Sequence, residues 1–213
     1  MIYNENIADK VAEFLLQIKA IKLQPSKPFV WASGWKSPIY CDNRKTLSYP
    51  PVRTFIRQQL SAAIQEKFPQ PDVIVGVATG GIAQGVLVAQ ELNLPFAYVR
   101  SSAKGHGLQN MVEGVVEEGQ RVVVVEDLVS TGGSSLKAVE ALCEKGCTVV
   151  GMVAIFSYDF DIAKENFEKH KCPLVVLSDY NYLINTALKN NYIAEKDVEI
   201  LKAWRQAPDK WNP

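Results

Sequence analysis

The hydrophobic pattern of the first fifty residues changes twice. Between residues 6 and 23, apolar side chains recur three and four positions apart, at Ile7, Val11, Phe14, Leu15, Ile18 and Ile21. This spacing places them on one face of a helix. Residues 28–42 then mix proline, glycine, serine and aromatic side chains, which predicts short strands or an irregular hood. A second helix is expected after Pro50-Pro51, because proline suits the first turn of a helix.

From residue 72 onward, short apolar runs alternate with helical stretches. The apolar runs are 73–77, 95–99, 122–125, 149–156 and 174–177, and the helical stretches are 82–92, 134–144 and 185–204. Because the runs are apolar throughout rather than at every second position, we expect strands buried on both faces. Such strands with intervening helices predict an α/β fold, with a doubly wound, mainly parallel sheet flanked by helices.

The predicted organisation is a single domain over residues 1–213, within which residues 1–45 form an N-terminal helix and hood. The seam between that helix and the hood is placed at Pro25 to Pro28. A chain of this length can bury one substantial core. Trp204 and Trp211 in the tail could cover the core or a subunit contact, and the burial habits of tryptophan favour the core.

Composition narrows the choice of partners and compartment. Lys and Arg number 23, as do Asp and Glu, so the net charge is zero. Nucleic-acid binding needs a clustered positive field, and we therefore expect no nucleic-acid partner. We also expect no membrane partner, because no segment approaches the roughly 18 apolar residues of a membrane helix. Cys41, Cys143, Cys147 and Cys172 form no CxxC pair, which predicts free thiols and a cytoplasmic protein.

Residues 122–134 combine a buried strand, two acids and a glycine-rich turn. Four valines lead to Glu126-Asp127, and the turn Ser130-Thr131-Gly132-Gly133-Ser134 opens the next helix. Ligands of open parallel sheets bind at the carboxyl ends of strands. The glycines and the helix N-terminus suit a phosphate, whereas the two acids suit hydroxyl groups or a metal. A phosphorylated sugar fits both halves, although the turn alone is equally compatible with a purely structural connection.

The order of this element resembles the phosphoribosyl-pyrophosphate signature of type I phosphoribosyltransferases. Three further segments resemble the orotate phosphoribosyltransferase family, in family order over nearly the whole chain. Residues 29–44, with Ser33-Gly34-Trp35-Lys36-Ser37-Pro38, resemble its hood, and residues 75–82 resemble its pyrophosphate-side loop. Residues 98–107 resemble its mobile catalytic loop. The resemblance implies the type I phosphoribosyltransferase fold and transfer of a phosphoribosyl group from phosphoribosyl pyrophosphate to orotate, giving orotidine 5′-monophosphate and pyrophosphate in de novo UMP biosynthesis.

Site residues follow from the same segments. Predicted catalytic residues are Asp127, Lys104, His106 and Arg100. Predicted substrate-binding residues are Glu126, Asp127, Leu128, Val129, Ser130, Thr131, Gly132, Gly133, Ser134, Tyr40, Cys41, Thr79 and Gly80. The three loop cations also make sense without the family, because cations placed on pyrophosphate stabilise the charge that develops on a leaving group. His170, near a helix end, is interpreted as structural.

The resemblance further implies Mg²⁺, held mainly by substrate oxygens rather than by a protein cluster, and a homodimer whose mobile loop reaches the partner's site. Ala32, Gly80 and Ser101 stand where some relatives carry lysine, so fewer cations are expected on pyrophosphate. An arginine that contacts orotate in some relatives has no clear match near Tyr158 or Phe160. Base recognition is therefore expected to rest on Ser130 and on backbone groups around Tyr40 and Cys41.

Three alternatives stay open on the sequence. A phosphoribosyltransferase for a purine or another base would share the acidic signature but should lack the Ser-Gly-x-x-Ser-Pro hood. A regulator that binds RNA or DNA should show a basic face. A paralogue with a dead site should lack the acid pair and the loop cations.

Overall fold

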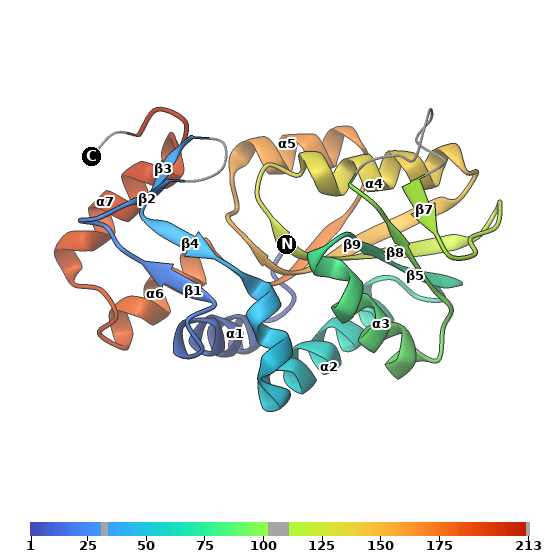
Figure 1. The fold of residues 1–213 in the computed structure, drawn as a ribbon, viewed down its shortest axis with the longest axis horizontal. Helices are drawn as coiled ribbons and strands as arrows, with labels where there is room; N and C mark the ends of the chain where they lie inside the picture. The colour runs from blue at the N-terminus through green and yellow to red at the C-terminus, as the bar shows by residue number, and fades with distance from the viewer. Residues whose placement is uncertain (31–33, 102–110, 212–213) are drawn as a thin grey trace.

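A six-stranded sheet forms the centre of the computed structural model, which describes residues 1–30, 34–101 and 111–211 (Figure 1). Its strands lie in the order β10-β9-β8-β5-β6-β7. They are β5 (Val73–Val77), β6 (Phe96–Val99), β7 (Val112–Glu113), β8 (Arg121–Val129), β9 (Thr148–Ser157) and β10 (Leu174–Asp179). Neighbouring strands are parallel except β7, which is antiparallel to β6. The predicted α/β fold with a mainly parallel sheet is confirmed.

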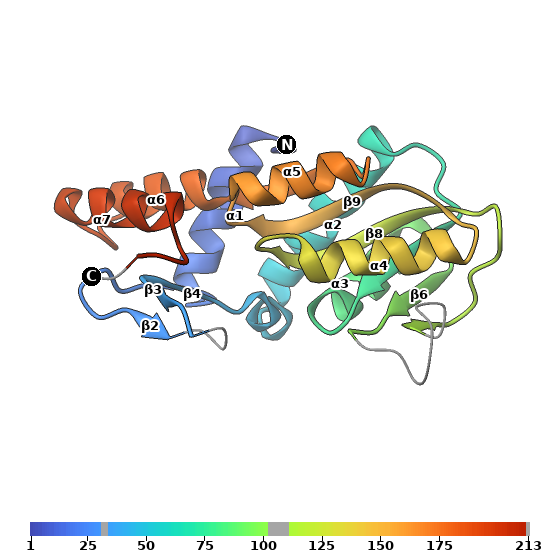
Figure 2. The same cartoon turned by 90° about the horizontal axis from the view of Figure 1, so that it is seen from above.

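Helices cover both faces of this sheet (Figures 1 and 2). One face carries α1 (Glu5–Gln17), α2 (Pro50–Lys67) and α3 (Gly80–Leu92), and the other carries α4 (Gly133–Glu144) and α5 (Asp161–Lys169). Ile74 and Val123 belong to the core on the first face, whereas Val75 and Val124 belong to the core on the second. Two cores on one sheet explain why its strands are apolar at every position.

The hood is built from short strands. These are β1 (Ile21–Leu23), β2 (Phe29–Val30), β3 (Lys36–Ser37) and β4 (Ile39–Cys41), followed by the 3-10 helix η1 (Asn43–Ser48). The prediction of one helix over residues 6–23 is wrong at its end. Lys19 has a left-handed φ of 54°, which ends the helix, and Ile21 pairs with Cys41 in an antiparallel ladder. The hood therefore begins before the predicted seam at Pro25 to Pro28.

The C-terminal part also differs from the prediction of one helix over residues 185–204. The structure has two helices, α6 (Tyr180–Lys189) and α7 (Glu195–Gln206), beside the hood (Figure 2). Asn191, with φ of 58°, lies in the connection between them. Trp204 is fully buried among Tyr158, Phe160 and Tyr180. Its packing against the core is confirmed, and its Nε1–H also donates to the Lys36 carbonyl oxygen of the hood at 3.2 Å.

All four cysteines are free thiols. Among residues 1–30, 34–101 and 111–211, no helix has the length and apolar character needed to cross a membrane.

Candidate active site

A cavity of about 480 Å³ opens at the carboxyl ends of β5 and β8. Segments that are far apart in the sequence line it, namely Cys41, Asp42 and Arg44 of the hood, Ala78, Thr79 and Gly80 after β5, Glu126, Asp127 and Leu128 of β8, and Ser130, Thr131, Gly132, Gly133 and Ser134 of the following turn. The fold thus brings three of the predicted motifs to one place, at the sheet edge where ligands of open parallel sheets bind.

The two adjacent acids have different environments. Glu126 is 5% exposed, and both of its carboxylate oxygens are engaged by the protein. The Ser135 hydroxyl donates to Oε2 at 2.9 Å, and the backbone N–H of Asp127 donates to Oε1 at 2.9 Å. Burial, and then the neighbouring charge of Asp127, raise the pKa of Glu126 well above its usual range.

Asp127 is partly exposed and faces the pyrophosphate-side loop. A side chain at Gly80 would collide with the Asp127 carboxylate, so a glycine is needed for this close approach. The peptide bond between Ala78 and Thr79 in the same loop is cis. Of the two acids, Asp127 is therefore the one whose carboxylate is available to a ligand in the cavity.

The turn after β8 has the backbone of an anion site. β8 extends further than predicted, because Leu128 and Val129 still pair with Phe156 and Ser157 of β9. Gly132 then adopts a left-handed φ of 83° as the N-cap of α4. The first N–H groups of a helix lack intrahelical acceptors and carry partial positive charge, so they attract a phosphate.

The turn is held from the side of α5. The Asn166 amide donates to the Thr131 carbonyl oxygen at 3.0 Å. Phe167 packs so closely that a Cβ on Gly132 would lie 2.9 Å from its ring. These contacts fix the backbone that would surround a phosphate.

The hood is joined to the acid pair by a hydrogen-bonded chain. The Asn43 amide donates to the Asp127 carbonyl oxygen at 2.6 Å, and the Cys41 thiol donates to the Asn43 side-chain oxygen at 3.2 Å. Burial, more than the nearby acids, raises the pKa of the Cys41 thiol well above its ordinary value, so the thiol stays neutral. The hood is thereby fixed to the strand that carries Asp127.

Three hood residues at this site were not predicted. Asp42 and Arg44 line the cavity and pair with each other at 2.6 Å, and Asn43 holds the Asp127 backbone. The available signal was their position, because they complete the hood segment that ends at Arg44. Tyr40, by contrast, is exposed on β4, its ring 5.7 Å from that of Phe29, and lies outside the cavity lining.

The predicted cations are only partly placed. Arg100 follows β6, and its Nη1 lies 3.4 Å from Oε1 of Glu113 on β7. It is outside the set of described residues that line the cavity. Lys104 and His106 lie outside the described residues. His170 ends α5, where its ring contacts the Asn166 carbonyl oxygen at 2.7 Å and the Glu140 carboxylate at 3.0 Å, as suits a structural residue.

The fold and this cavity place the chain among phosphoribosyltransferases. A family model described as "Phosphoribosyl transferase domain" matches residues 52–190, which contain strands β5 to β10 and the turn after β8. The chain is 60% identical to an orotate phosphoribosyltransferase of Phocaeicola vulgatus, over 94% of this chain and 95% of that protein.

Two solved structures extend the comparison. A crystal structure of orotate phosphoribosyltransferase from Aeropyrum pernix superimposes with a TM-score of 0.74 at 29% identity, covering 86% of this chain and 99% of that one. The UMP synthase of Leishmania donovani superimposes with a TM-score of 0.78 at 26% identity, over 93% of this chain and 42% of that chain. The chain belongs to the orotate phosphoribosyltransferase family.

Proposed function

We propose that this protein transfers the phosphoribosyl group of phosphoribosyl pyrophosphate to orotate, releasing pyrophosphate and orotidine 5′-monophosphate, in de novo UMP biosynthesis. One observation carries the proposal. A partly exposed carboxylate, Asp127, lies in one cavity with a helix N-terminus that is open to a phosphate, and the hood of the orotate phosphoribosyltransferase family closes the same cavity. The choice of orotate as the base rests on the family and on the relatives named above.

The substrate can be assigned to parts of the cavity. The backbone N–H groups and hydroxyls from Ser130 to Ser134 would hold the 5′-phosphate, and Asp127 would hold the ribose hydroxyls. Val129, which the sequence also suggested, is fully buried and is not among the residues that line the cavity. Glu126 would contribute only indirectly, by holding the backbone of Asp127. Its own carboxylate oxygens already accept hydrogen bonds from Ser135 and from the Asp127 N–H. Orotate would lie beside the hood, near Ser130 and the backbone of Tyr40 and Cys41. Thr79 and Gly80 would approach the pyrophosphate.

The reaction breaks the bond between the anomeric carbon and pyrophosphate and forms a bond from that carbon to a nitrogen of orotate. Positive charge develops on the sugar, and negative charge develops on the leaving pyrophosphate. Asp127 stabilises the first by its proximity, and Arg100, Lys104 and His106 would stabilise the second. Closure of their loop would exclude water from the reactive sugar.

The cavity also suits Mg²⁺ bound mainly through the substrate. Within the described residues, no group of three or more His, Cys, Asp or Glu side chains could hold a metal. Asp127 and Asp42 nevertheless give the cavity wall carboxylate oxygens, which Mg²⁺ prefers, and Mg²⁺ commonly keeps few protein ligands. When bound, the ion neutralises the charge of the leaving group.

Three organisational features belong to the same proposal. The chain acts as one domain, with residues 1–45 as its helix and hood subregion, and the four free thiols fit the cytoplasm. The active form is a homodimer in which the loop carrying Lys104 reaches the partner's cavity. Mixing a Lys104→Ala chain with an Asp127→Asn chain tests the dimer. If turnover is recovered on mixing, the site is shared between subunits. If a verified mixed dimer of the two variants stays inactive, the shared site is contradicted.

The activity is tested by following orotate consumption by ultraviolet absorbance, with phosphoribosyl pyrophosphate and Mg²⁺ each omitted in turn. Consumption that requires both supports the proposal. No consumption of orotate, but consumption of adenine, guanine, xanthine or uracil in the same format, would move the proposal to another base. Inactivity with all five bases would reject a phosphoribosyltransferase and make nucleotide or RNA binding the next measurement.

A further inference from the structure

A second cavity of about 480 Å³ lies outside the active site, between α5 and the edge strand β10. Its walls are mainly apolar, although the charged residues Lys164, Glu168 and Lys171 also belong to the lining. Phe160, Ala163 and Phe167 line it from α5 and its N-cap, and Leu174 and Val176 line it from β10. Ile2 closes the edge by bridging to Val176. Cavities of this size, with apolar walls and a few polar groups, are the common form of small-molecule sites.

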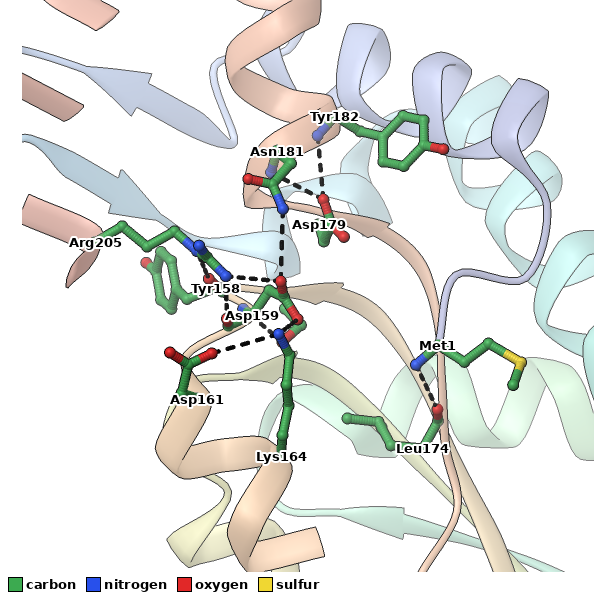
Figure 3. Close-up of polar contacts among 11 residues, drawn as sticks. Met1, Tyr158, Asp159, Asp161, Lys164, Leu174, Asp179, Asn181, Tyr182 and Arg205 are labelled. Carbon is green, nitrogen blue, oxygen red and sulfur yellow. Dashed lines mark hydrogen bonds and ion pairs between the residues drawn. The ribbon is translucent and has the colours of Figure 1, made fainter. Parts of the chain in front are cut away.

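The polar end of this cavity lies at the carboxyl ends of β9 and β10, where Ser157, Asp159 and Asp179 line it. The charge of Asp159 is already neutralised. Its carboxylate lies 2.7 Å from Nη2 of Arg205 and 3.2 Å from Nζ of Lys164 (Figure 3). Asn181 adds a long contact to the same carboxylate at 3.5 Å. Asp159 is therefore already paired with residues of the protein and is not available to bind a charged ligand.

Asp179 is different. It is 8% exposed, and its Oδ1 caps α6 by accepting from the N–H groups of Asn181 and Tyr182 at 2.9 and 3.1 Å (Figure 3). Among the described residues, no donor is hydrogen-bonded to its other oxygen. The nearby Met1 ammonium donates to the Leu174 carbonyl oxygen at 3.0 Å. The second oxygen is not among the buried atoms that lack a partner, so it is accessible to a donor or cation of a ligand in the cavity that Asp179 lines.

We propose that this cavity binds a small ligand with an apolar body and one protonated amine, which docks on Asp179. The apolar wall would take up the body of the ligand, and the amine would supply the missing partner of the carboxylate. Burial raises the pKa of Asp179, while its two backbone hydrogen bonds and the charge of Arg205 act in the opposite direction. An anionic ligand of the same shape would meet the Asp179 carboxylate and should bind less tightly than the amine.

The cavity is also connected to the active site through α5. Phe167 lines the cavity and also packs against Gly132 of the turn at residues 130–134, called the phosphate turn below. Its neighbour Asn166 holds the Thr131 carbonyl oxygen of the same turn. A ligand that moves Phe167 must therefore move or brace the turn proposed to hold the 5′-phosphate. This second part of the inference rests on the proposed function. It makes the cavity an effector site, whose ligand changes the binding of phosphoribosyl pyrophosphate in the active site.

Binding is measured first, by calorimetry on the whole protein without substrates, so that it does not depend on any assay of turnover. The probes are 2-phenylethylamine, 2-phenylethanol and 3-phenylpropionate, which share an apolar body and differ in charge. The amine is expected to bind one per chain and at least tenfold more tightly than the alcohol, and the carboxylate is expected to bind less tightly than the amine. No binding of the amine at millimolar concentration, or equal affinities of amine and alcohol, would overturn the site.

Three variants locate the bound probe. Asp179→Asn keeps a good helix cap while removing the charge, and Ala163→Met fills the cavity from α5. Each is expected to weaken amine binding at least tenfold. Asp161→Asn is the control. It removes an exposed charge at the start of α5, outside the cavity, and should leave binding unchanged. Wild-type affinity in both Asp179→Asn and Ala163→Met, each checked for a normal thermal transition, would place the probe elsewhere and overturn the assignment.

The coupling is measured by steady-state kinetics with the amine at saturation. The KM for phosphoribosyl pyrophosphate is expected to change at least threefold while the KM for orotate stays constant, and Asp179→Asn should abolish the effect. Intact amine binding with no change in either KM would overturn the effector role. Calorimetric binding in a protein that does not consume orotate would instead reject the proposed function and leave the site standing.

Discussion

The turn at residues 130–134 and the hood both line one cavity, but they are built in different ways. The turn is contiguous, since strand β8, which contains the acid pair, leads through the turn to the start of α4 within residues 121–133. The hood is assembled from distant segments. Ile21 pairs with Cys41, Trp204 donates to the Lys36 carbonyl oxygen, and Asn43 reaches the backbone of Asp127. A contiguous site depends mainly on local backbone geometry, whereas an assembled one depends on packing far from the ligand.

The same difference appears in the match to the family. The family model covers residues 52–190 and so contains the turn, while the hood and α7 lie outside it. Substitutions in the turn should therefore affect the use of phosphoribosyl pyrophosphate, which the whole family shares. Substitutions at the hood should affect the binding of the base. Substitutions in each region separate the two roles.

The largest effect is expected at the acid that faces the cavity. Asp127→Asn should lower kcat by about 10²–10³-fold, because it removes the charge that stabilises the developing sugar cation. Turnover and the thermal transition are measured together, so that loss of activity is not confused with unfolding. His170→Ala is the control, since His170 ends α5 away from the cavity, and it should leave turnover unchanged. Equal effects of the two substitutions would mean that the site is misplaced.

Loop cations should act on turnover rather than on affinity. Lys104→Ala and His106→Ala are each expected to lower kcat by roughly 100-fold, with a much smaller change in KM, because contacts to the leaving pyrophosphate strengthen in the transition state. Steady-state constants for both substrates measure this. A change in KM at constant kcat would contradict a role in the transition state and assign both residues to substrate binding.

A smaller effect is expected where α7 supports the hood. Trp204→Phe keeps an aromatic ring in the buried cluster but removes the Nε1–H that donates to the Lys36 carbonyl oxygen at 3.2 Å. Stability should fall by about 1 kcal/mol for the lost hydrogen bond, with a further loss from the smaller ring. The KM for orotate should rise a few-fold, while that for phosphoribosyl pyrophosphate stays constant.

Trp211→Phe is the matched substitution, because Trp211 packs at the margin of the same core. It should change neither KM. Equal increases in both KM values for Trp204→Phe would contradict a hood-specific role.

The smallest effect concerns the pH dependence of stability. The folded pKa of Glu126 is raised, so its favourable contribution is complete below the unfolded pKa and is lost as pH rises through the folded value. Glu126→Gln removes this buried charge and retains groups that can bond Ser135 and the Asp127 backbone. It should be more stable than the wild type by about 1 kcal/mol at neutral pH, with the difference vanishing near pH ~4.

Urea unfolding at several pH values checks this, with exposed Glu117→Gln as the control. A neutral-pH stability equal to that of the wild type would show that Glu126 is not an unfavourable buried charge. Because the Glu126→Gln substitution also changes the neighbourhood of Asp127, a loss of kcat alongside the gain in stability is expected.

The sequence was most informative where local patterns are sufficient. Fully apolar runs predicted strands buried on both faces, and the order of Glu126, Asp127 and the glycine-rich turn predicted where the cavity lies. It was least informative at the ends of elements. A helical spacing of apolar residues continues through Ile21, yet Ile21 belongs to a strand, because pairing with Cys41 and burial outweigh the local pattern.

By itself, the sequence determined the parallel sheet, the contiguous phosphate turn and the family, because periodicity and turn chemistry are local properties. Only the tertiary structure decided that Glu126 is engaged by Ser135 while Asp127 faces the cavity, that Asn43 joins the hood to the acid pair, and that a second cavity shares α5 with the phosphate turn. Burial, hydrogen-bond partners and cavities depend on residues that are distant along the chain, and no local pattern encodes which of those residues will meet.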